Sequence, residues 1–397
     1  MNPARITTPR SPPLPLPPSG QRLRMVIRAL LRVLAVLSGV CALIALAWHM
    51  WQPGANLQKI AGTEQMRQLF ANKQHGIWMQ HAWLADDAWL ARNGKRADDF
   101  RDPTHLRATA DLLRQHGVRY LYPHLCPAQP DGKLPASNAG QVERFLSVFD
   151  DFDVLPWIGG ANGASAQPES PAWRRGFANS IHDLMAQHPR LAGVHVNIEP
   201  LKSGDVNFVT LLHEVRQALP EKKILSVAAY PPDTFLQPSP EVHWRETFFR
   251  LIAGRCDQMV VMMYDTGLPS QKIYQWLMAD WTAQVLEWSA GTGPTRRIGQ
   301  MDGPGMMPVL LGVPAYEDAG VAWHDPAVEN LSNALSGITA GLTRSPASNR
   351  KHFGGVAIYN EWEMDATEWT LLANVLGKTK PATAAKPGAA MENMRQK

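Results

Sequence analysis

Short apolar runs alternate with longer amphipathic segments over most of the chain. Apolar runs of this length, bounded by Gly, Pro and polar residues, predict β-strands, and the amphipathic segments predict helices. The predicted strands are 76–84, 118–125, 153–160, 191–200, 223–231, 258–265, 307–316 and 353–362. The predicted helices are 102–116, 138–149, 171–188, 205–219, 240–254, 269–290, 325–342 and 366–377, several of which open with Pro or with an N-capping Asp or Ser.

Regular alternation of strands with helices predicts parallel strand pairing, because each helix returns the chain to the start of the next strand. Eight such units over roughly 300 residues fit a closed (β/α)8 TIM barrel, here over 73–377. An open doubly wound sheet is the alternative. It is disfavoured because no glycine-rich phosphate loop follows the first strand, "GIWMQHAW". The predicted fold class is therefore α/β, a TIM barrel.

A continuous apolar segment lies before this domain. No residue in 33–48 is charged, and these 16 residues are fewer than the ~20 that a spanning helix needs. Extension towards the N-terminus, with Arg28 and Arg32 snorkelling, makes a span feasible. We therefore expect a single transmembrane signal-anchor over 25–51. A cleaved signal peptide, with "ALA" at 45–47 resembling a cleavage site, is the alternative.

The charge distribution predicts the orientation of this segment. The first 32 residues hold six Arg and no acidic residue, so we expect a cytoplasmic N-terminus and a single pass through the inner (cytoplasmic) membrane. The barrel would then be periplasmic or extracellular. The rest of the chain is close to neutral, which argues against nucleic acid as a partner. Composition further predicts a Pro-rich disordered segment over 1–24, a connector over 52–72 and a disordered tail over 378–397.

Cysteine and metal-ligand spacings are uninformative. Cys41, Cys126 and Cys256 form no CxxC motif, and the latter two can pair only if the fold brings them together. No HExxH or similar ligand spacing occurs, so we expect no metal and no cofactor.

The strand "LAGVHVNIEP" at 191–200 carries polar side chains on one face. Successive strand residues alternate in direction, so His195, Asn197 and Glu199 share a face opposite to the apolar one. In a barrel this polar face points inward, with Glu199 nearest the C-terminal end, where barrel enzymes place their chemistry. An unpartnered buried carboxylate is costly, so this pattern favours function over a merely structural polar cluster.

Several strand-end motifs resemble glycoside hydrolase family 18, the chitinase-like barrels. The family's fourth-strand signature, DxxDxDxE, aligns with Ala192, His195, Asn197 and Glu199, so only the terminal Glu is kept. The family's sixth-strand Met-x-Tyr-Asp is intact as "MMYD" at 262–265. "LGVPAY" at 311–316 and "GGVAIY" at 354–359 resemble its seventh-strand and eighth-strand motifs, with Tyr in place of the usual final Trp.

The resemblance implies substrate-assisted retaining hydrolysis, in which the 2-acetamido oxygen of the sugar attacks the anomeric carbon. Glu199 would protonate the leaving oxygen, Asn197 would orient the acetamide and Tyr264 would hydrogen-bond its carbonyl. An amide at 197 carries no full charge and stabilises the developing cation less than a carboxylate does. The family 85 endo-acting N-acetylglucosaminidases are similar here, with an Asn-x-Glu pair that performs both tasks.

Further residues are expected to bind a polysaccharide or oligosaccharide substrate. Aromatic faces stack on pyranose rings, and the predicted strand ends carry several aromatic and polar side chains. The expected substrate-binding residues are Trp157, His195, Asp265, Tyr316, Tyr359 and Trp362.

Two other functions stay open. One is a two-carboxylate retaining glycosidase with Glu317 as nucleophile, which needs carboxyls roughly 5–5.5 Å apart. The other is a barrel that binds a polysaccharide or a cell-envelope partner without cleaving it, because three of the four signature positions are replaced.

Overall fold

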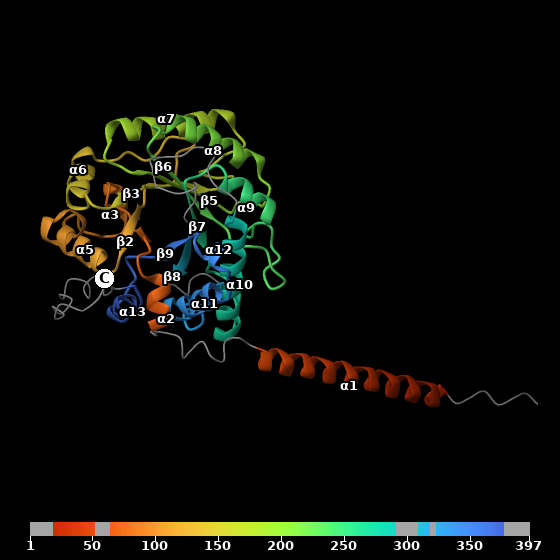
Figure 1. Cartoon of the computed structure of the whole chain (residues 1–397). Helices are drawn as coiled ribbons and strands as arrows, with labels where there is room; N and C mark the ends of the chain where they lie inside the picture. The colour runs from red at the N-terminus through yellow and green to blue at the C-terminus, as the bar shows by residue number, and fades with distance from the viewer. Residues whose placement is uncertain (1–18, 52–63, 291–308, 318–322, 377–397) are drawn as a thin grey trace, which may run out of the picture. The chain divides into compact units, whose positions relative to one another are not determined.

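The computed structural model describes residues 19–51, 64–290, 309–317 and 323–376 (Figure 1). The chain divides into two compact units, Met1–Pro53 and Gly54–Lys397. The predicted tail over 378–397 and most of the predicted Pro-rich segment over 1–24 lie outside the described residues.

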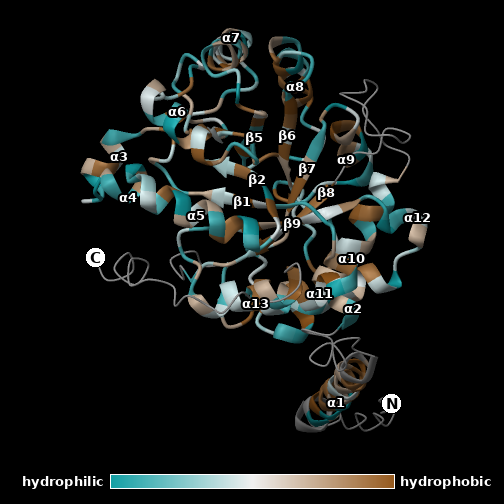
Figure 2. Ribbon diagram, turned by 60° about the vertical axis from the view of Figure 1, so that its left-hand side comes forward, coloured by the Kyte–Doolittle hydropathy of each residue, from teal (hydrophilic) through white to brown (hydrophobic). Residues whose placement is uncertain are grey.

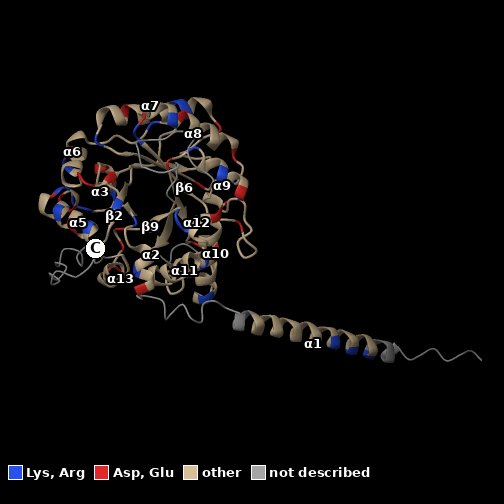
Figure 3. Cartoon of the chain, viewed as in Figure 1, with Lys and Arg blue, Asp and Glu red and all other residues tan. Residues whose placement is uncertain are grey.

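The first unit contains one long helix, α1 (Ser19–Trp51). Its stretch Arg24–Ala47 is 24 residues long and, by length and composition, apolar enough to cross a membrane, although a signal sequence passes the same test. At 1.5 Å per residue such a stretch covers the ~30 Å of a bilayer core. Apolar residues cover most of α1 in Figure 2, and its basic residues lie towards its N-terminal end in Figure 3.

The second unit is built around a ring of parallel strands. The strands are β1 (His75–Met79), β2 (Val118–Pro123), β3 (Asp153–Val154), β4 (Trp157–Ala161), β5 (Gly193–Glu199), β6 (Ile224–Ala229), β7 (Gln258–Met262), β8 (Val309–Pro314) and β9 (Phe353–Tyr359). They pair in the order β3-β2-β1-β9-β8-β7-β6-β5-β4. β3 and β4, the first and last strands in this order, are parts of one predicted strand. Only Leu155 and Pro156 separate them, so the chain itself joins the two edges of the sheet. His124 bridges to Trp157, which joins β2 to β4 as well. The ring is closed, and the predicted eight-stranded TIM barrel is confirmed.

Helices surround the strands, as Figure 1 shows. The helices of this unit are α2 (Glu64–Phe70), α3 (Asp87–Arg92), α4 (Asp98–Arg101), α5 (Pro103–Gln115), α6 (Ala139–Val148), α7 (Pro171–Gln187), α8 (Val206–Ala218), α9 (Glu246–Ala253), α10 (Gln271–Ser289), α11 (Leu331–Arg344), α12 (Ala347–Arg350) and α13 (Ala366–Leu376). Each of the eight predicted helices has a counterpart among them.

Two predicted helices start too early. The helix predicted over 325–342 begins at Leu331, because the Asn330 side chain accepts a hydrogen bond from the Asn333 N–H and caps the helix there. The helix predicted over 240–254 begins at Glu246. In both cases the residues before the helix form turns at the C-terminal end of the barrel, where binding residues concentrate.

The helix α2 lies in the second half of the predicted connector and packs against α11 and α13. Met66 and Phe70 of α2 are buried. The Phe70 ring packs edge-on against Phe353, the first residue of β9, with 5.5 Å between ring centroids.

Candidate active site

The polar face of β5 points into the barrel as expected. Val194, Val196 and Ile198 are 0–2% exposed on its other face, among the residues of the apolar core. His195, Asn197 and Glu199 occupy the inner face, and the exposed fraction increases along the strand from 0% at His195 to 6% at Asn197. Glu199 is partly exposed at the C-terminal end.

Close strand packing next to Asn197 depends on a glycine. Gly159 of β4 pairs with Asn197. Gly159 has a φ of +128°, and a Cβ atom there would lie 1.9 Å from the Asn197 carbonyl oxygen. Any larger residue would therefore separate β4 from β5 beside the site.

A pocket opens at this end of the barrel, with about 340 Å³ of empty space when the open solvent at its mouth is included. It is lined by Trp78, Trp157, Asn197, Glu199, Tyr264, Asp265 and Tyr359. All three predicted catalytic residues and three of the six predicted substrate-binding residues thus line one cavity. They come from β4, β5, β9 and the residues that follow β7.

Asn197 and Glu199 contact each other in this pocket. Asn197 Nδ2 donates a hydrogen bond of 2.5 Å to Glu199 Oε1. The amide nitrogen thus faces Glu199, and Asn197 Oδ1 is directed elsewhere. That oxygen is buried and has no hydrogen-bond partner among the described residues. A buried acceptor without a partner costs free energy unless a ligand donates to it.

The surroundings of Glu199 favour a protonated carboxyl group. Burial raises the pKa of Glu199, and the charge of Asp265 raises it further. The hydrogen bonds from Asn197 and, at 3.4 Å, from the Tyr230 hydroxyl act in the opposite direction, yet the pKa stays above its usual value. A raised pKa lets a carboxyl group keep its proton to a higher pH than usual, as a general acid requires.

Aromatic rings form the walls of the pocket. Tyr359 lies at the centre of this group: its ring stacks on Tyr264 with 5.4 Å between centroids and meets Trp157 edge-on at 6.2 Å. Burial raises the pKa of the Tyr264 phenol well above its usual value, so this hydroxyl remains a donor. Trp362 packs edge-on against Tyr359 at 5.8 Å, outside the residues that line the cavity.

Asp265 and Tyr316 form a second polar pair at the mouth of the pocket. The Tyr316 hydroxyl donates a hydrogen bond to Asp265 Oδ1. The Asp265 side chain is 39% exposed, so its carboxyl group is accessible from solvent. Tyr316 contacts Tyr359 as well, with the rings edge-on and 5.4 Å apart, although Tyr316 does not line the cavity itself.

His195 lies below the pocket rather than in it. Its Nδ1 is 2.8 Å from the Ser226 hydroxyl, which in turn donates to Gln258 at 2.7 Å. The Tyr122 hydroxyl donates to the same Gln258 oxygen at 2.8 Å. Burial lowers the pKa of His195 to about 3, so the ring is neutral. This residue belongs to a polar layer that links four strands beneath the pocket floor.

Two residues of the site were not identified from the sequence. Trp78 of β1 lines the cavity and packs edge-on against Tyr359 at 5.7 Å. Tyr230, directly after β6, contacts Glu199. Tyr230 ends its apolar run at a predicted strand end, which is the signal that indicated Tyr316 and Tyr359. Trp78 lies within a strand, where sequence gives no sign of which aromatic residue faces the interior.

Other groups considered from the sequence lie elsewhere. Glu317 is exposed and does not line the pocket. Cys126 and Cys256 are buried and not bonded to each other. Across residues 64–290, 309–317 and 323–376 no group of three or more His, Cys, Asp or Glu side chains is arranged to hold a metal ion.

A family model matches the sequence over much of the barrel. The model of the glycosyl hydrolases family 18 matches residues 124–337, which is more than half of the 397 residues. A search of curated proteins finds no match.

Solved structures with a similar fold include enzymes from several organisms. A chitinase from Chromobacterium violaceum is 14% identical with a TM-score of 0.49, and the alignment covers 77% of this chain and 100% of that one. The spore cortex-lytic enzyme SleL of Bacillus megaterium is 15% identical with a TM-score of 0.46, covering 78% and 76%. A family 18 chitinase from Cycas revoluta is 15% identical with a TM-score of 0.45, covering 77% and 100%. At these identities, the assignment to a family rests on the family model.

Proposed function

From the premise that the chain belongs to family 18 of the glycosyl hydrolases and is a glycosidase, we propose a substrate class. The enzyme cleaves β-linked polysaccharides that contain N-acetylhexosamine. In the proposed reaction the 2-acetamido oxygen of the substrate is the nucleophile, and the anomeric configuration is retained. The observation that carries the proposal is the Asn197–Glu199 pair. It combines a carboxyl group with a raised pKa and a buried amide oxygen to which no group in the described part of the chain donates.

Each protein group has one task in this mechanism. Glu199 gives its proton to the leaving glycosidic oxygen. Asn197 Oδ1 accepts the acetamide N–H and thereby aims the acetamide oxygen at the anomeric carbon. Tyr264 donates a hydrogen bond to that oxygen as positive charge develops on the oxazolinium ring. The aromatic walls, Trp78 and Tyr359 among them, provide apolar faces for the sugar ring.

The same barrel end offers a place for the rest of a polymer. Trp157, Tyr316 and Trp362 surround the pocket, and we assign them to substrate binding together with Asp265. His195 supports the site from below rather than by contact with the sugar, because it is 0% exposed.

We further propose that α1 holds the enzyme in the inner membrane with its N-terminus in the cytoplasm. The length of the apolar stretch and the Arg residues at its N-terminal side support this topology. The barrel would then meet envelope polysaccharide such as peptidoglycan outside the cytoplasm.

The decisive experiment compares the full chain, solubilised in detergent, with its Glu199→Gln variant. Both are incubated with N-acetylhexosamine oligosaccharides and with peptidoglycan, and new reducing ends are measured. We expect turnover by the wild type and a loss in Glu199→Gln with retained folding. Equal turnover by both proteins would refute the role of Glu199.

Two further arms separate the alternatives. A fully de-N-acetylated oligosaccharide lacks the acetamide nucleophile and should not be cleaved, whereas a two-carboxylate enzyme would tolerate it. Glu317→Gln should leave the rate unchanged, and its loss of activity would favour that second mechanism. Sugar binding without turnover by the wild type would favour the non-enzymatic barrel. The three replaced signature positions, Ala192, His195 and Asn197, are the observation behind that alternative.

A further inference from the structure

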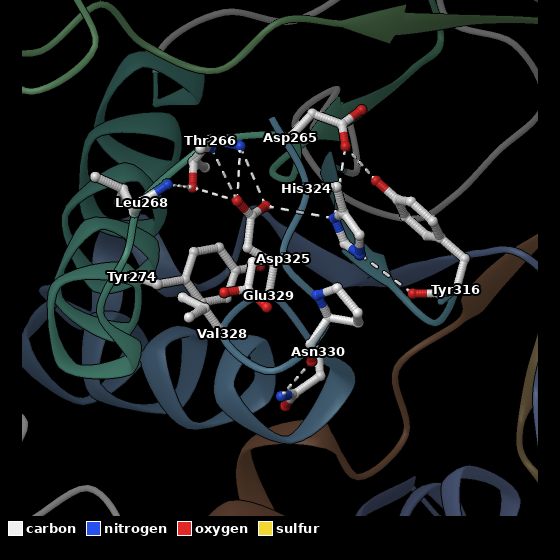
Figure 4. Close-up of polar contacts among 12 residues, drawn as sticks. Asp265, Thr266, Leu268, Tyr274, Tyr316, His324, Asp325, Val328, Glu329 and Asn330 are labelled. Atoms are coloured by element: carbon white, nitrogen blue, oxygen red, sulfur yellow. Dashed lines mark hydrogen bonds and ion pairs between the residues drawn. The ribbon is translucent and has the colours of Figure 1, made fainter. Parts of the chain in front are cut away.

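A buried carboxylate lies behind the mouth of the pocket, in the loop before α11. Glu329 is 0% exposed. Its carboxyl group accepts hydrogen bonds from the Thr266 N–H at 3.0 Å, the Thr266 hydroxyl at 2.7 Å and the Gly267 N–H at 3.0 Å (Figure 4). These donors come from the two residues directly after Asp265. Glu329 therefore fixes the backbone that carries Asp265 into the pocket.

The hydrogen bonds to Glu329 hold a turn of unusual backbone conformation. Asp265 has a φ of +59°, in the left-handed region that non-glycine residues seldom adopt. Such a residue persists only where the surrounding structure holds it. The Glu329 hydrogen bonds on one side and the Tyr316 hydroxyl on the other supply that hold.

His324 lies between the two carboxylates. Its Nδ1 is 3.6 Å from Asp265 Oδ1 and 3.8 Å from Glu329 Oε2, and its side chain is 0% exposed. Its Nε2 is 3.2 Å from the Tyr316 carbonyl oxygen, and the two rings stack with 4.0 Å between centroids. Asp265, Glu329 and Tyr316 are the titratable groups that face this imidazole among the described residues.

The geometry indicates the charge of this ring. A carbonyl oxygen only accepts, so Nε2 must carry a hydrogen. In a neutral ring Nδ1 would then direct its lone pair at two carboxylates. If Nδ1 is protonated as well, the ring is an imidazolium, and its positive charge faces both carboxylates.

We propose that His324 is a positioning residue: as an imidazolium buried between Glu329 and Asp265, it holds the Asp265 carboxylate ionised and in place at the mouth of the pocket. Asp265 then acts as a fixed acceptor for a polar group of the substrate. The part of this inference that is tested by enzymatic activity rests on the proposed function.

The electrostatics at this end of the barrel are consistent with such coupling. Burial by itself lowers the pKa of His324, but the charge of Glu329 and that of Asp265 raise it above its usual value. Burial and the charge of Glu329 raise the pKa of Asp265, whereas the Tyr316 hydrogen bond and the His324 charge lower it, and on balance this pKa stays above its usual value. The charge of Asp265 in turn raises the pKa of Glu199. The charge of His324 therefore affects the pKa of the general acid Glu199 indirectly, through the Asp265 carboxylate.

The activity arm of the test uses a double-mutant cycle. The kcat/KM of the detergent-solubilised full chain is measured against pH for the wild type, His324→Gln, Asp265→Asn and the double variant. Loss of the positive charge raises the pKa of Asp265, so the acid limb of His324→Gln should move to higher pH by roughly one unit. In the Asp265→Asn background the same substitution should have no further effect. An unmoved acid limb, or an equal effect of His324→Gln in both backgrounds, would overturn the proposal.

A second arm needs no turnover, so it separates this inference from the proposed function. A group whose pKa is raised on folding contributes stability below its unfolded pKa, and this contribution is lost as pH rises through its folded pKa. The apparent Tm of the wild type should therefore fall more steeply than that of His324→Gln as the pH rises above about 6.5.

His352→Gln is the matched control. His352 is a buried histidine directly before β9, at the other end of the barrel, and its pKa is lowered by burial. It does not titrate in this alkaline window, so His352→Gln should retain the wild-type slope. Identical slopes for the wild type and His324→Gln would show that His324 carries no charge between the carboxylates and would overturn the inference even for an inactive protein.

Discussion

Asn197 occupies the position where the family signature has aspartate, and its contacts give a reason why the site can function with an amide. The amide nitrogen binds Glu199 at 2.5 Å, which leaves the amide oxygen as a buried acceptor. A carboxylate at this position would place a second negative charge against Glu199. Asparagine instead gives Glu199 a neutral donor and the substrate an acceptor.

Substitution of Asn197 tests its two roles, as a donor to Glu199 and as an acceptor for the substrate. Asn197→Ala removes the acceptor for the acetamide N–H, and we expect kcat to fall by roughly 10²–10³-fold. Asn197→Asp restores an acceptor and repels an ionised Glu199, so activity should persist with the alkaline limb at higher pH. Steady-state rates across pH check both. An unchanged kcat in Asn197→Ala would exclude a role for this side chain in the chemistry.

At the scale of the element, β5 and the helix that follows it act as a rigid support for the site. β5 ends at Glu199, and α8 begins at Val206 after a short connection. The N-cap of α8 is Asp205, whose carboxyl group accepts from the Asn207 and Phe208 N–H groups at 2.8 and 3.0 Å. This cap fixes where the connection from Glu199 ends.

Removal of this cap should lower stability without altering the chemistry. Asp205→Ala leaves two helix N–H groups without their side-chain acceptor and is expected to cost about 1 kcal/mol. Asp205→Asn keeps an equivalent acceptor and serves as the control. Urea unfolding of the two variants measures the difference. Equal midpoints would mean that solvent satisfies these N–H groups equally well.

The helix α1 gives a second prediction at this scale. If α1 is an uncleaved anchor, the full chain should remain in the membrane fraction after an alkaline wash, with its first residues present by mass spectrometry. A chain that starts after Ala47 and is recovered in the soluble fraction would show a cleaved signal peptide instead. Deletion of 1–51 should release the barrel in either case.

At the scale of the whole molecule, the active site reduces the stability of the barrel. Glu199 has a raised pKa, so the folded state binds its proton more tightly than the unfolded state does. Stability then falls as pH rises from the unfolded pKa to the folded one, because the unfolded state binds fewer protons there. The buried carboxyl group that can act as an acid is thus a thermodynamic cost at neutral pH.

Glu199→Gln should therefore be more stable than the wild type at neutral pH and nearly equal to it near pH 4. Each unit by which folding raises the pKa of Glu199 corresponds to about 1.4 kcal/mol. Thermal unfolding of both proteins at the two pH values measures the effect. A lower Tm for Glu199→Gln at neutral pH would show that its carboxylate stabilises the fold.

The sequence by itself determined the strand and helix order, because hydrophobic periodicity is a local property. It also predicted that Asn197 and Glu199 share the inward face of their strand, because strand alternation fixes which residues share a face. Tyr264 was predicted from the resemblance of "MMYD" at 262–265 to the family motif. The predicted starts of two helices were wrong, since turns and the Asn330 cap at the C-terminal end of the barrel take precedence over helical periodicity.

Only the tertiary structure decided which of these side chains meet. The positions of Trp78 and Tyr230 beside Glu199, the burial of His195 beneath the pocket and the contact of His324 with Asp265 all join distant strands. Such contacts depend on ring closure and on the register between strands, which no local pattern encodes. The raised pKa values of Glu199 and His324 depend on burial and on these long-range neighbours, so they too are properties of the folded barrel.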